Sequence, residues 1–432
     1  MKDDWEINFK EVKQNKQKRN KNLKNKGIFK KISQSIFKKN EEQNKNKKSK
    51  YSILLDEERG NVNQNINKIR NPGVDFVRII AMYSIVLHHH FFYGNDIKYF
   101  PQYKRELSLI HSIVSAHNDI FILISGIVGY KTYRYSNLIY LWLTVLFYSV
   151  GINQYTSFFE KKFYDDKSSY KIYYPMIFER YWYFSTYFGM YLFLPVINKG
   201  IEHLTKNEFR LVLITIFFTF IFWKGYKNPE NDLFHLNDGK SVIWFLIFYL
   251  TGAYIGKYRV DYTWKKKIVL CCICLFIFAF ISYLYFKILN NEFDITIVFL
   301  NFKIPSVLSQ FLNEKADSLL KIVQAITICL FFLQIKYNKY IAKIICFFGP
   351  LVFSVYLIHN TGFIIDKFII NTFVYLPKDI GFNSLLNTLL FKSLKMLIFC
   401  LTIDYLRHLL FTFLKIKKTL LYLESKLKEK LN

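Results

Sequence analysis

Acidic residues are scarce in this 432-residue chain, which has 32 Asp and Glu against 60 Lys and Arg and a formal net charge of +28. The six cysteines fall inside apolar stretches without a second CxxC pair or His ligands at zinc-site spacing. We interpret them as buried thiols that act as small apolar side chains, so a disulfide framework and a zinc site are excluded. The polar, basic N-terminal region also excludes a cleavable signal peptide, and no Asn-x-Ser/Thr sequon marks a glycosylated loop.

The motifs of soluble nucleotide-using enzymes are missing as well, since the chain has no GxxxxGK[ST], no GxGxxG after a strand and no GxSxG. What the chain does have is a 52% hydrophobic and 19% aromatic composition. From residue 76 onward, apolar runs of about 17–25 residues recur nearly to the end, a length that suits transmembrane helices. The distribution excludes a soluble globular enzyme and an ordinary nucleic-acid-binding domain, and it indicates an integral membrane protein.

The N-terminal region, residues 1–71, is rich in Lys, Asn and Gln and is expected to be a mostly disordered cytoplasmic extension. Within it, residues 25–39 place Ile28, Ile32 and Ile36 four residues apart between flanking lysines. This pattern fits a short amphipathic helix on an anionic lipid surface, and it fits equally a solvated charge run with apolar spacing by chance.

The apolar runs predict an all-α, polytopic membrane helix bundle with about ten transmembrane helices between residues 72 and 414. An even number of spans places both termini on one side, and the basic N-terminal extension and the basic tail 415–432 assign that side to the cytoplasm. Residues 295–312 are apolar but interrupted, and we expect a re-entrant or interfacial piece there. The ten predicted spans are 75–94, 109–130, 136–153, 181–199, 209–223, 241–257, 267–288, 318–335, 345–370 and 386–412.

The first predicted span carries the most informative ionisable residues, which are costly inside a bilayer and are therefore functional candidates. Arg78 and His89 are eleven residues apart, about 1100° of helix, so they share one face at a separation of about 16 Å. An arginine suits phosphate recognition and a histidine suits proton transfer. The alternative is a positive-inside arginine with structural histidines. His88, His89 and His90 diverge around the helix and are not expected to bind a metal ion together.

Two further predicted spans contain polar or aromatic candidates. The second span places the Asp119 carboxylate within the membrane, and its Ser125-Gly126 pair permits close helix approach or lines a substrate. The fourth span begins with an aromatic cluster around Trp182, which fits either an interfacial aromatic belt or a platform for stacking sugars.

Two late spans contain the remaining buried charges and histidine. A lone mid-span histidine such as His359 is more often a packing residue than a catalyst. Asp404 and Arg407 lie three residues apart, which favours a structural ion pair at the cytoplasmic end of the last span.

Together these segments resemble the acyltransferase-3 family of integral membrane, acyl-CoA-dependent acyltransferases. The family signature of an arginine, ten intervening residues and a histidine matches Arg78 and His89. The F-x-x-x-S-G phrase matches residues 121–126, the aromatic phrase of the family resembles residues 181–199, and the Y-L-x-H phrase matches residues 356–359.

The similarity covers about residues 72–412 and is most like polysaccharide O-acetyltransferases. It implies transfer of an acetyl group from cytoplasmic acetyl-CoA to a hydroxyl of a glycan, with His89 as general base or relay and Arg78 placing the donor. The implied substrate and donor cavity contains Asp119, Ser125, Gly126, Trp182, Tyr356 and His359.

The chain departs from the family pattern at two places. Asp119 stands where related sequences tend to have Asn, and the cluster of arginines after the F-x-x-x-S-G phrase is reduced to Lys131 and Arg134, the candidates for the donor phosphates. Ser125 as an acyl carrier stays an alternative to a packing role.

Two other functions use the same features. A proton-coupled membrane transporter would use the buried His, Arg and Asp without acyl chemistry, and a membrane tether would use the basic tail. The sequence predicts the lipid bilayer and a hydroxyl acceptor as partners, with no nucleic acid and no metal. The plasma or inner membrane and an endomembrane are both compatible with it.

Overall fold

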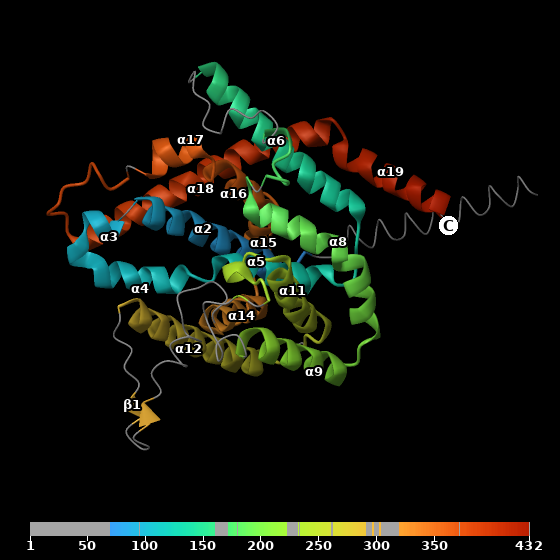
Figure 1. The fold of residues 1–432 in the computed structure, drawn as a ribbon, viewed down its shortest axis with the longest axis horizontal. Helices are drawn as coiled ribbons and strands as arrows, with labels where there is room; N and C mark the ends of the chain where they lie inside the picture. The colour runs from blue at the N-terminus through green and yellow to red at the C-terminus, as the bar shows by residue number, and fades with distance from the viewer. Residues whose placement is uncertain are drawn as a thin grey trace, which may run out of the picture. The chain divides into compact units, whose positions relative to one another are not determined.

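The structure is a computed structural model, and it describes residues 70–431 except for 95, 160–171, 179, 223–231, 233, 261, 291–295, 298–301, 304–318 and 371. The predicted amphipathic helix 25–39 lies outside the described residues. Residues Asn71–Asn432 form one compact unit, and its elements are shown in Figure 1. Two short strands, β1 (Thr296–Ile297) and β2 (Phe302–Lys303), pair in an antiparallel arrangement. They belong to the segment 295–312 that was expected to be re-entrant, and most of that segment lies outside the described residues.

Helices make up nearly all of the described structure, which confirms the predicted all-α class. Short helical turns occur at η1 (Pro101–Tyr103), η2 (Phe218–Phe222), η3 (Asn237–Gly239) and η4 (Ile365–Ile369). The α-helices are α2 (Pro72–Gly94), α3 (Asp96–Tyr99), α4 (Lys104–Val114), α5 (His117–Gly129), α6 (Tyr135–Phe159), α8 (Trp182–His203), α9 (Lys206–Phe217), α11 (Val242–Lys257), α12 (Trp264–Leu289), α14 (Leu319–Gln334), α15 (Lys339–Phe348), α16 (Val352–His359), α17 (Gly362–Ile364), α18 (Phe382–Phe413) and α19 (Ile416–Leu431).

The described helices include fewer candidate membrane spans than the ten apolar runs of the sequence. Within the described part of the chain, 4 helices are long and apolar enough to cross a membrane, or 5 when the bent pair α15 and α16 counts as one span. The predicted single span 345–370 is broken by a 41° bend between these two helices. Pro350 accounts for the break, because proline lacks the amide donor that a continuous helix would need there. The count of ten therefore stays a prediction.

A seam of glycines joins α5 to α11 and fixes one side of the bundle. A Cβ atom at Gly126 would lie 2.1 Å from the Tyr249 carbonyl oxygen, and one at Gly252 would lie 2.1 Å from the Leu123 carbonyl oxygen. Gly256 packs in the same way against Ile127, so the two helices run parallel. Gly252 and Gly256 form a GxxxG pattern, in which small residues let two backbones approach closely.

Helix α2 lies at the centre of the described unit and contacts α4, α5, α14, α15, α16 and α18. Figure 1 shows it between α18 and α4. Its apolar side chains Val77, Ala81 and Val86 are almost fully buried. Gly349 lets the α15–α16 bend approach Asp75, because a Cβ atom there would lie 2.5 Å from the Asp75 Cβ atom. The polar groups of α2 are thus held inside the bundle.

The C-terminal helices hold α6 through two polar contacts. Asp404 and Arg407 form a buried ion pair with an Nε–Oδ1 distance of 2.6 Å, which confirms the predicted pair, and the Tyr148 hydroxyl donates to Asp404 at 2.8 Å. The expected basic tail 415–432 contains the helix α19. Its Glu424 carboxylate accepts hydrogen bonds from the backbone amides of Tyr135 and Ser136, and so it caps the first turn of α6.

The structure describes all six cysteines, and none of them forms a disulfide. Cys274, Cys329 and Cys400 are buried as predicted. Cys272 is exposed, which corrects the expectation for that residue. Cys272 lies on the long helix α12, and most of the apolar surface of α12 is not covered by other helices, which explains the difference.

Candidate active site

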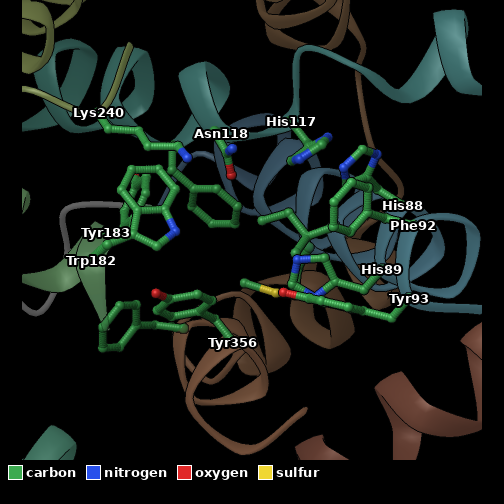
Figure 2. Close-up of a pocket in the computed structure, with 14 residues that line it drawn as sticks. His88, His89, Phe92, Tyr93, His117, Asn118, Trp182, Tyr183, Lys240 and Tyr356 are labelled. Atoms are coloured by element: carbon green, nitrogen blue, oxygen red, sulfur yellow. The ribbon is translucent and has the colours of Figure 1, made fainter. Parts of the chain in front are cut away.

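A cavity of about 290 Å³ opens beside the histidine-rich turn of α2 (Figure 2). Its walls come from α2, α5, α8, the turn before α11, and α16. In Figure 2, His88, His89 and Tyr93 face Trp182 and Lys240 across the cavity, with Asn118 on the α5 side and Tyr356 on the α16 side. The cavity is lined by Met82, Ile85, His88, His89, Phe92, Tyr93, His117, Asn118, Phe121, Trp182, Tyr183, Lys240, Phe353 and Tyr356.

The three consecutive histidines of α2 face three different neighbours. The His88 ring lies 4.9 Å from the rings of His111 and His117, on α4 and α5. His89 meets His359 on α16. His90 is buried and hydrogen-bonded to Val86 on its own helix and to Ser393 on α18. This divergence follows from the 100° rotation per residue of an α-helix. Among the described residues, no group of three or more His, Cys, Asp or Glu side chains is arranged to hold a metal ion.

A hydrogen-bonded chain assigns the protons of the His359–His89 pair. The Nδ1 atom of His359 lies 2.5 Å from the Val355 carbonyl oxygen, which only accepts, so Nδ1 carries a proton. In the neutral ring, Nε2 of His359 is then an acceptor, and it lies 2.9 Å from Nδ1 of His89. Nδ1 of His89 therefore donates, and its Nε2 atom holds the lone pair. His359 is fully buried, whereas His89 lines the cavity.

Aromatic side chains line the cavity that His89 faces. The Tyr93 ring lies 5.2 Å from the His89 ring in an edge-to-face arrangement. Trp182, which was predicted to belong either to an interfacial aromatic belt or to a platform for stacking sugars, lies on the cavity wall. Tyr183 lies on the same wall, and so does Tyr356, which the family resemblance places in the cavity. Such a wall offers flat apolar faces with polar edges, the surface that a sugar ring or a short acyl group can contact.

Three other residues predicted for the cavity lie outside its lining. The Asp119 carboxylate accepts a hydrogen bond from the Trp244 indole at 3.0 Å and is buried between α5 and α11. Ser125 donates to the Phe121 carbonyl oxygen one turn earlier. Gly126 belongs to the α5–α11 seam. These contacts are structural, and they hold the walls from which Asn118 and Phe121 enter the cavity.

Arg78 lies near the other end of α2 and is absent from the cavity lining. Its guanidinium forms an ion pair with Asp75 at 2.6 Å and remains partly exposed. Tyr187 on α8 is hydrogen-bonded to the Ser125 side chain and lies within electrostatic reach of Arg78. Neither Tyr187 nor Arg78 lines the cavity.

The two candidates for donor phosphates lie at the same end of the bundle as Arg78. Lys131 lines a second cavity of about 740 Å³ together with Lys199 and Lys257. Arg134 is not among the residues that line it, and its carbonyl oxygen accepts from Tyr191. Tyr130 of this cavity and Asn118 of the first are twelve residues apart, so along α5 the two cavities are separated by about 18 Å.

The sequence did not point to Asn118, Tyr183 or Lys240 as cavity residues. Asn118 follows the α4–α5 junction, and only the packing of α5 against α2 turns it inward. Lys240 directly precedes Ser241, whose hydroxyl caps α11 by accepting from the Trp244 amide. A serine before an apolar run is a helix-start signal that locates the turn, although it does not show what the turn faces.

Apolar helices around a buried histidine pair define the class, an integral membrane protein with a polar site inside its helix bundle. The family follows from the sequence: the acyltransferase domain model, acyltransferase 3, matches residues 71–405. The chain belongs to this family and is a membrane acyltransferase. Comparisons with curated proteins and with solved structures found no match.

Proposed function

We propose that the protein is an O-acetyltransferase that moves an acetyl group from acetyl-CoA to a hydroxyl of a cell-surface or lumenal glycan. The observation that supports it best is the chain from Val355 through His359 to His89, which leaves a basic nitrogen of His89 for the cavity. A general base must lie within hydrogen-bonding reach of the proton it removes, and the cavity provides space for a hydroxyl there.

In the proposed reaction, Nε2 of His89 takes the proton of the acceptor hydroxyl while the hydroxyl oxygen attacks the thioester carbonyl. The tetrahedral oxyanion then expels the thiolate of CoA, and His89 returns the proton to that thiolate. One C–S bond breaks, one C–O bond forms, and no proton is released overall. His359 accepts a hydrogen bond from His89 throughout and stabilises the imidazolium that forms in between.

The donor is proposed to enter from the end of the bundle that carries Arg78, Lys131 and Arg134. Their cationic groups suit the phosphates of acetyl-CoA, and the second cavity lies at this end. The thioester arm would then extend about 18 Å along α5 toward His89. We propose that this end and both termini are cytoplasmic, and that residues 1–71 bind anionic lipid there.

The function is tested with purified protein in vesicles supplied with labelled acetyl-CoA and membrane glycans. We expect base-labile label on the glycan with the wild type, a loss of about 10²–10⁴-fold with His89→Gln, and no loss with His90→Gln. His90 is the matched control, because it neighbours His89 and faces Ser393 away from the cavity. Absence of labelled product from the wild type would contradict the proposal and favour proton-coupled transport.

A further inference from the structure

Lys240 reaches the cavity from a turn that is held in an unusual backbone conformation. Four residues just before it have positive φ angles, namely His235 at 49°, Asn237 at 50°, Asp238 at 51° and Gly239 at 83°. Asn, Asp and His adopt this left-handed region more readily than other non-glycine residues, so the sequence of the turn suits its conformation. Backbone in this region is found at turns and at binding sites, where it sets the direction of the following residue.

Hydrogen bonds on both sides enforce this turn. The Asp232 carboxylate accepts from the backbone amides of Leu236 and Asn237. The Lys240 amide donates to the Asn237 carbonyl oxygen, and the Lys240 carbonyl oxygen accepts from the Thr186 hydroxyl of α8 at 3.0 Å. The backbone of Lys240 is therefore fixed between α8 and α11, and its side chain is directed to the cavity (Figure 2).

The ammonium group of Lys240 lies next to the aromatic wall. Its Nζ atom is 5.6 Å from the centre of the Trp182 ring, and Figure 2 shows it pointing toward Asn118. A sugar ring that packs against the aromatic wall would place its substituents within reach of the Lys240 ammonium. The opposite side of the cavity holds His89, so one bound unit can contact both groups.

The charges of the cavity have one sign. Among the described residues that line it there is no Asp or Glu, and Lys240 is the single Lys or Arg. Asp119, the nearest carboxylate in sequence on α5, is outside the lining: it accepts from the Trp244 indole and lies within electrostatic reach of Tyr183. Lys240 is exposed at the edge of the cavity, and a cation with no carboxylate beside it in the lining attracts an anionic ligand.

We propose that the acceptor is an anionic sugar unit, whose carboxylate or phosphate group binds Lys240 while one of its hydroxyls faces His89. This inference rests on the proposed acetyl transfer, because it names the acceptor of that reaction. Trp182 and Tyr183 contact the sugar ring, and Asn118 offers a neutral hydrogen-bond partner at the same edge. Lys240 is thus a specificity-determining residue, and the removal of a proton is left to His89.

The experiment compares three soluble acceptors with the same aglycone: a uronic acid glycoside, the matching 6-phosphate sugar and the matching neutral glycoside. Initial rates with labelled acetyl-CoA are measured in vesicles for the wild type, Lys240→Gln and Lys240→Arg. Lys265→Gln is the matched control, since Lys265 has a similar position over Trp264 at 5.9 Å, away from the cavity. Lys240 itself has a φ of −102°, so its substitution adds no backbone strain.

We expect the wild type to prefer an anionic acceptor, and Lys240→Gln to raise its KM about fivefold without changing the KM of the neutral acceptor. Lys240→Arg should restore the preference, and Lys265→Gln should keep it. Raising the ionic strength should weaken the anionic preference of the wild type but not that of Lys240→Gln. The uronate and phosphate arms show which anion is the better fit.

Several results would overturn this inference. If the wild type used the neutral and anionic acceptors equally, and Lys240→Gln behaved like the wild type, the proposal of an anionic acceptor would be refuted. The proposed acetyl transfer would still hold. A higher KM for acetyl-CoA in Lys240→Gln, with acceptor KM unchanged, would assign the lysine to the donor. If the wild type acetylates none of the three acceptors and no membrane glycan, the proposed function fails together with the inference.

Discussion

Replacing His359 by leucine tests how the buried histidine pair works. His359 holds the Nδ1–H of His89 at 2.9 Å and is itself oriented by Val355. Leucine fills a similar volume but accepts no hydrogen bond. In the variant, His89 loses both the partner that selects its tautomer and the partner that stabilises its protonated form.

The size of the effect follows from the change in that hydrogen bond during the reaction. Between two neutral rings it contributes about 1 kcal/mol, and to a charged ring about 1.5–3 kcal/mol. The surplus, about 0.5–2 kcal/mol, belongs to the protonated intermediate, and each 1.36 kcal/mol corresponds to about a factor of ten in rate. Together with the loss of tautomer selection, His359→Leu should lower kcat about 10- to 100-fold.

The assay is the initial rate of acetyl transfer at varied acceptor concentration. The acceptor KM should stay unchanged, because His359 is fully buried and does not line the cavity. His359→Gln should recover part of the rate, since its amide oxygen can accept from His89. His359→Leu should add almost nothing to His89→Gln, because both act on the same step.

Two results would refute the relay. The first is a wild-type rate in correctly folded His359→Leu protein. The second is a double variant whose loss equals the product of the two single losses, since independent residues give additive free energies. His90→Gln again serves as the control for changes in helix packing.

Two further predictions concern stability. Gly252→Ala should lower the thermal unfolding midpoint in detergent, at a cost of about 1–3 kcal/mol, because its Cβ atom would collide with the α5 backbone, whereas Gly200→Ala, which meets open space, should not. Burial raises the pKa of Glu424, but hydrogen bonds with Ser136 and Lys428 outweigh it and hold that pKa below its usual value. Its contribution is therefore present above the unfolded pKa and lost as pH falls through the lower folded value. The hydrogen-exchange protection factor of the first turn of α6 should fall on acidification below the ordinary glutamate pKa in the wild type, and Glu424→Gln should remove this pH dependence.

Local sequence patterns predicted the features that depend on neighbouring residues. Apolar runs located the helices, and the three-residue spacing of Asp404 and Arg407 predicted their ion pair. The rotation along α2 predicted that His88, His89 and His90 diverge. The bend at Pro350 was not predicted, since residues 345–370 were expected to form one span, although proline regularly interrupts a helix.

The arrangement of the site depended on contacts between distant residues and could not be predicted in this way. By its own helix His359 looked like an ordinary packing histidine, and the family resemblance placed it in the cavity; its pairing with His89, 270 positions away in the chain, was not predicted. Asp119 looked like a cavity residue because nothing in its own helix shows that the Trp244 indole of α11 binds it. Lys240 looked like a loop residue because its direction is set by positive φ angles and by Thr186.

Because the α2 histidines point in different directions, the number of residues between Arg78 and His89 fixes the angle between them around the helix axis as well as their distance. One inserted residue would shift the arginine by only 1.5 Å along the axis but would turn it by 100° relative to the histidines. Arg78 and Asp75 would turn together, keep their ion pair and leave the side of Tyr187, while the histidines kept their three neighbours. The length of the interval thus sets the angle between the arginine and the histidines around the helix axis.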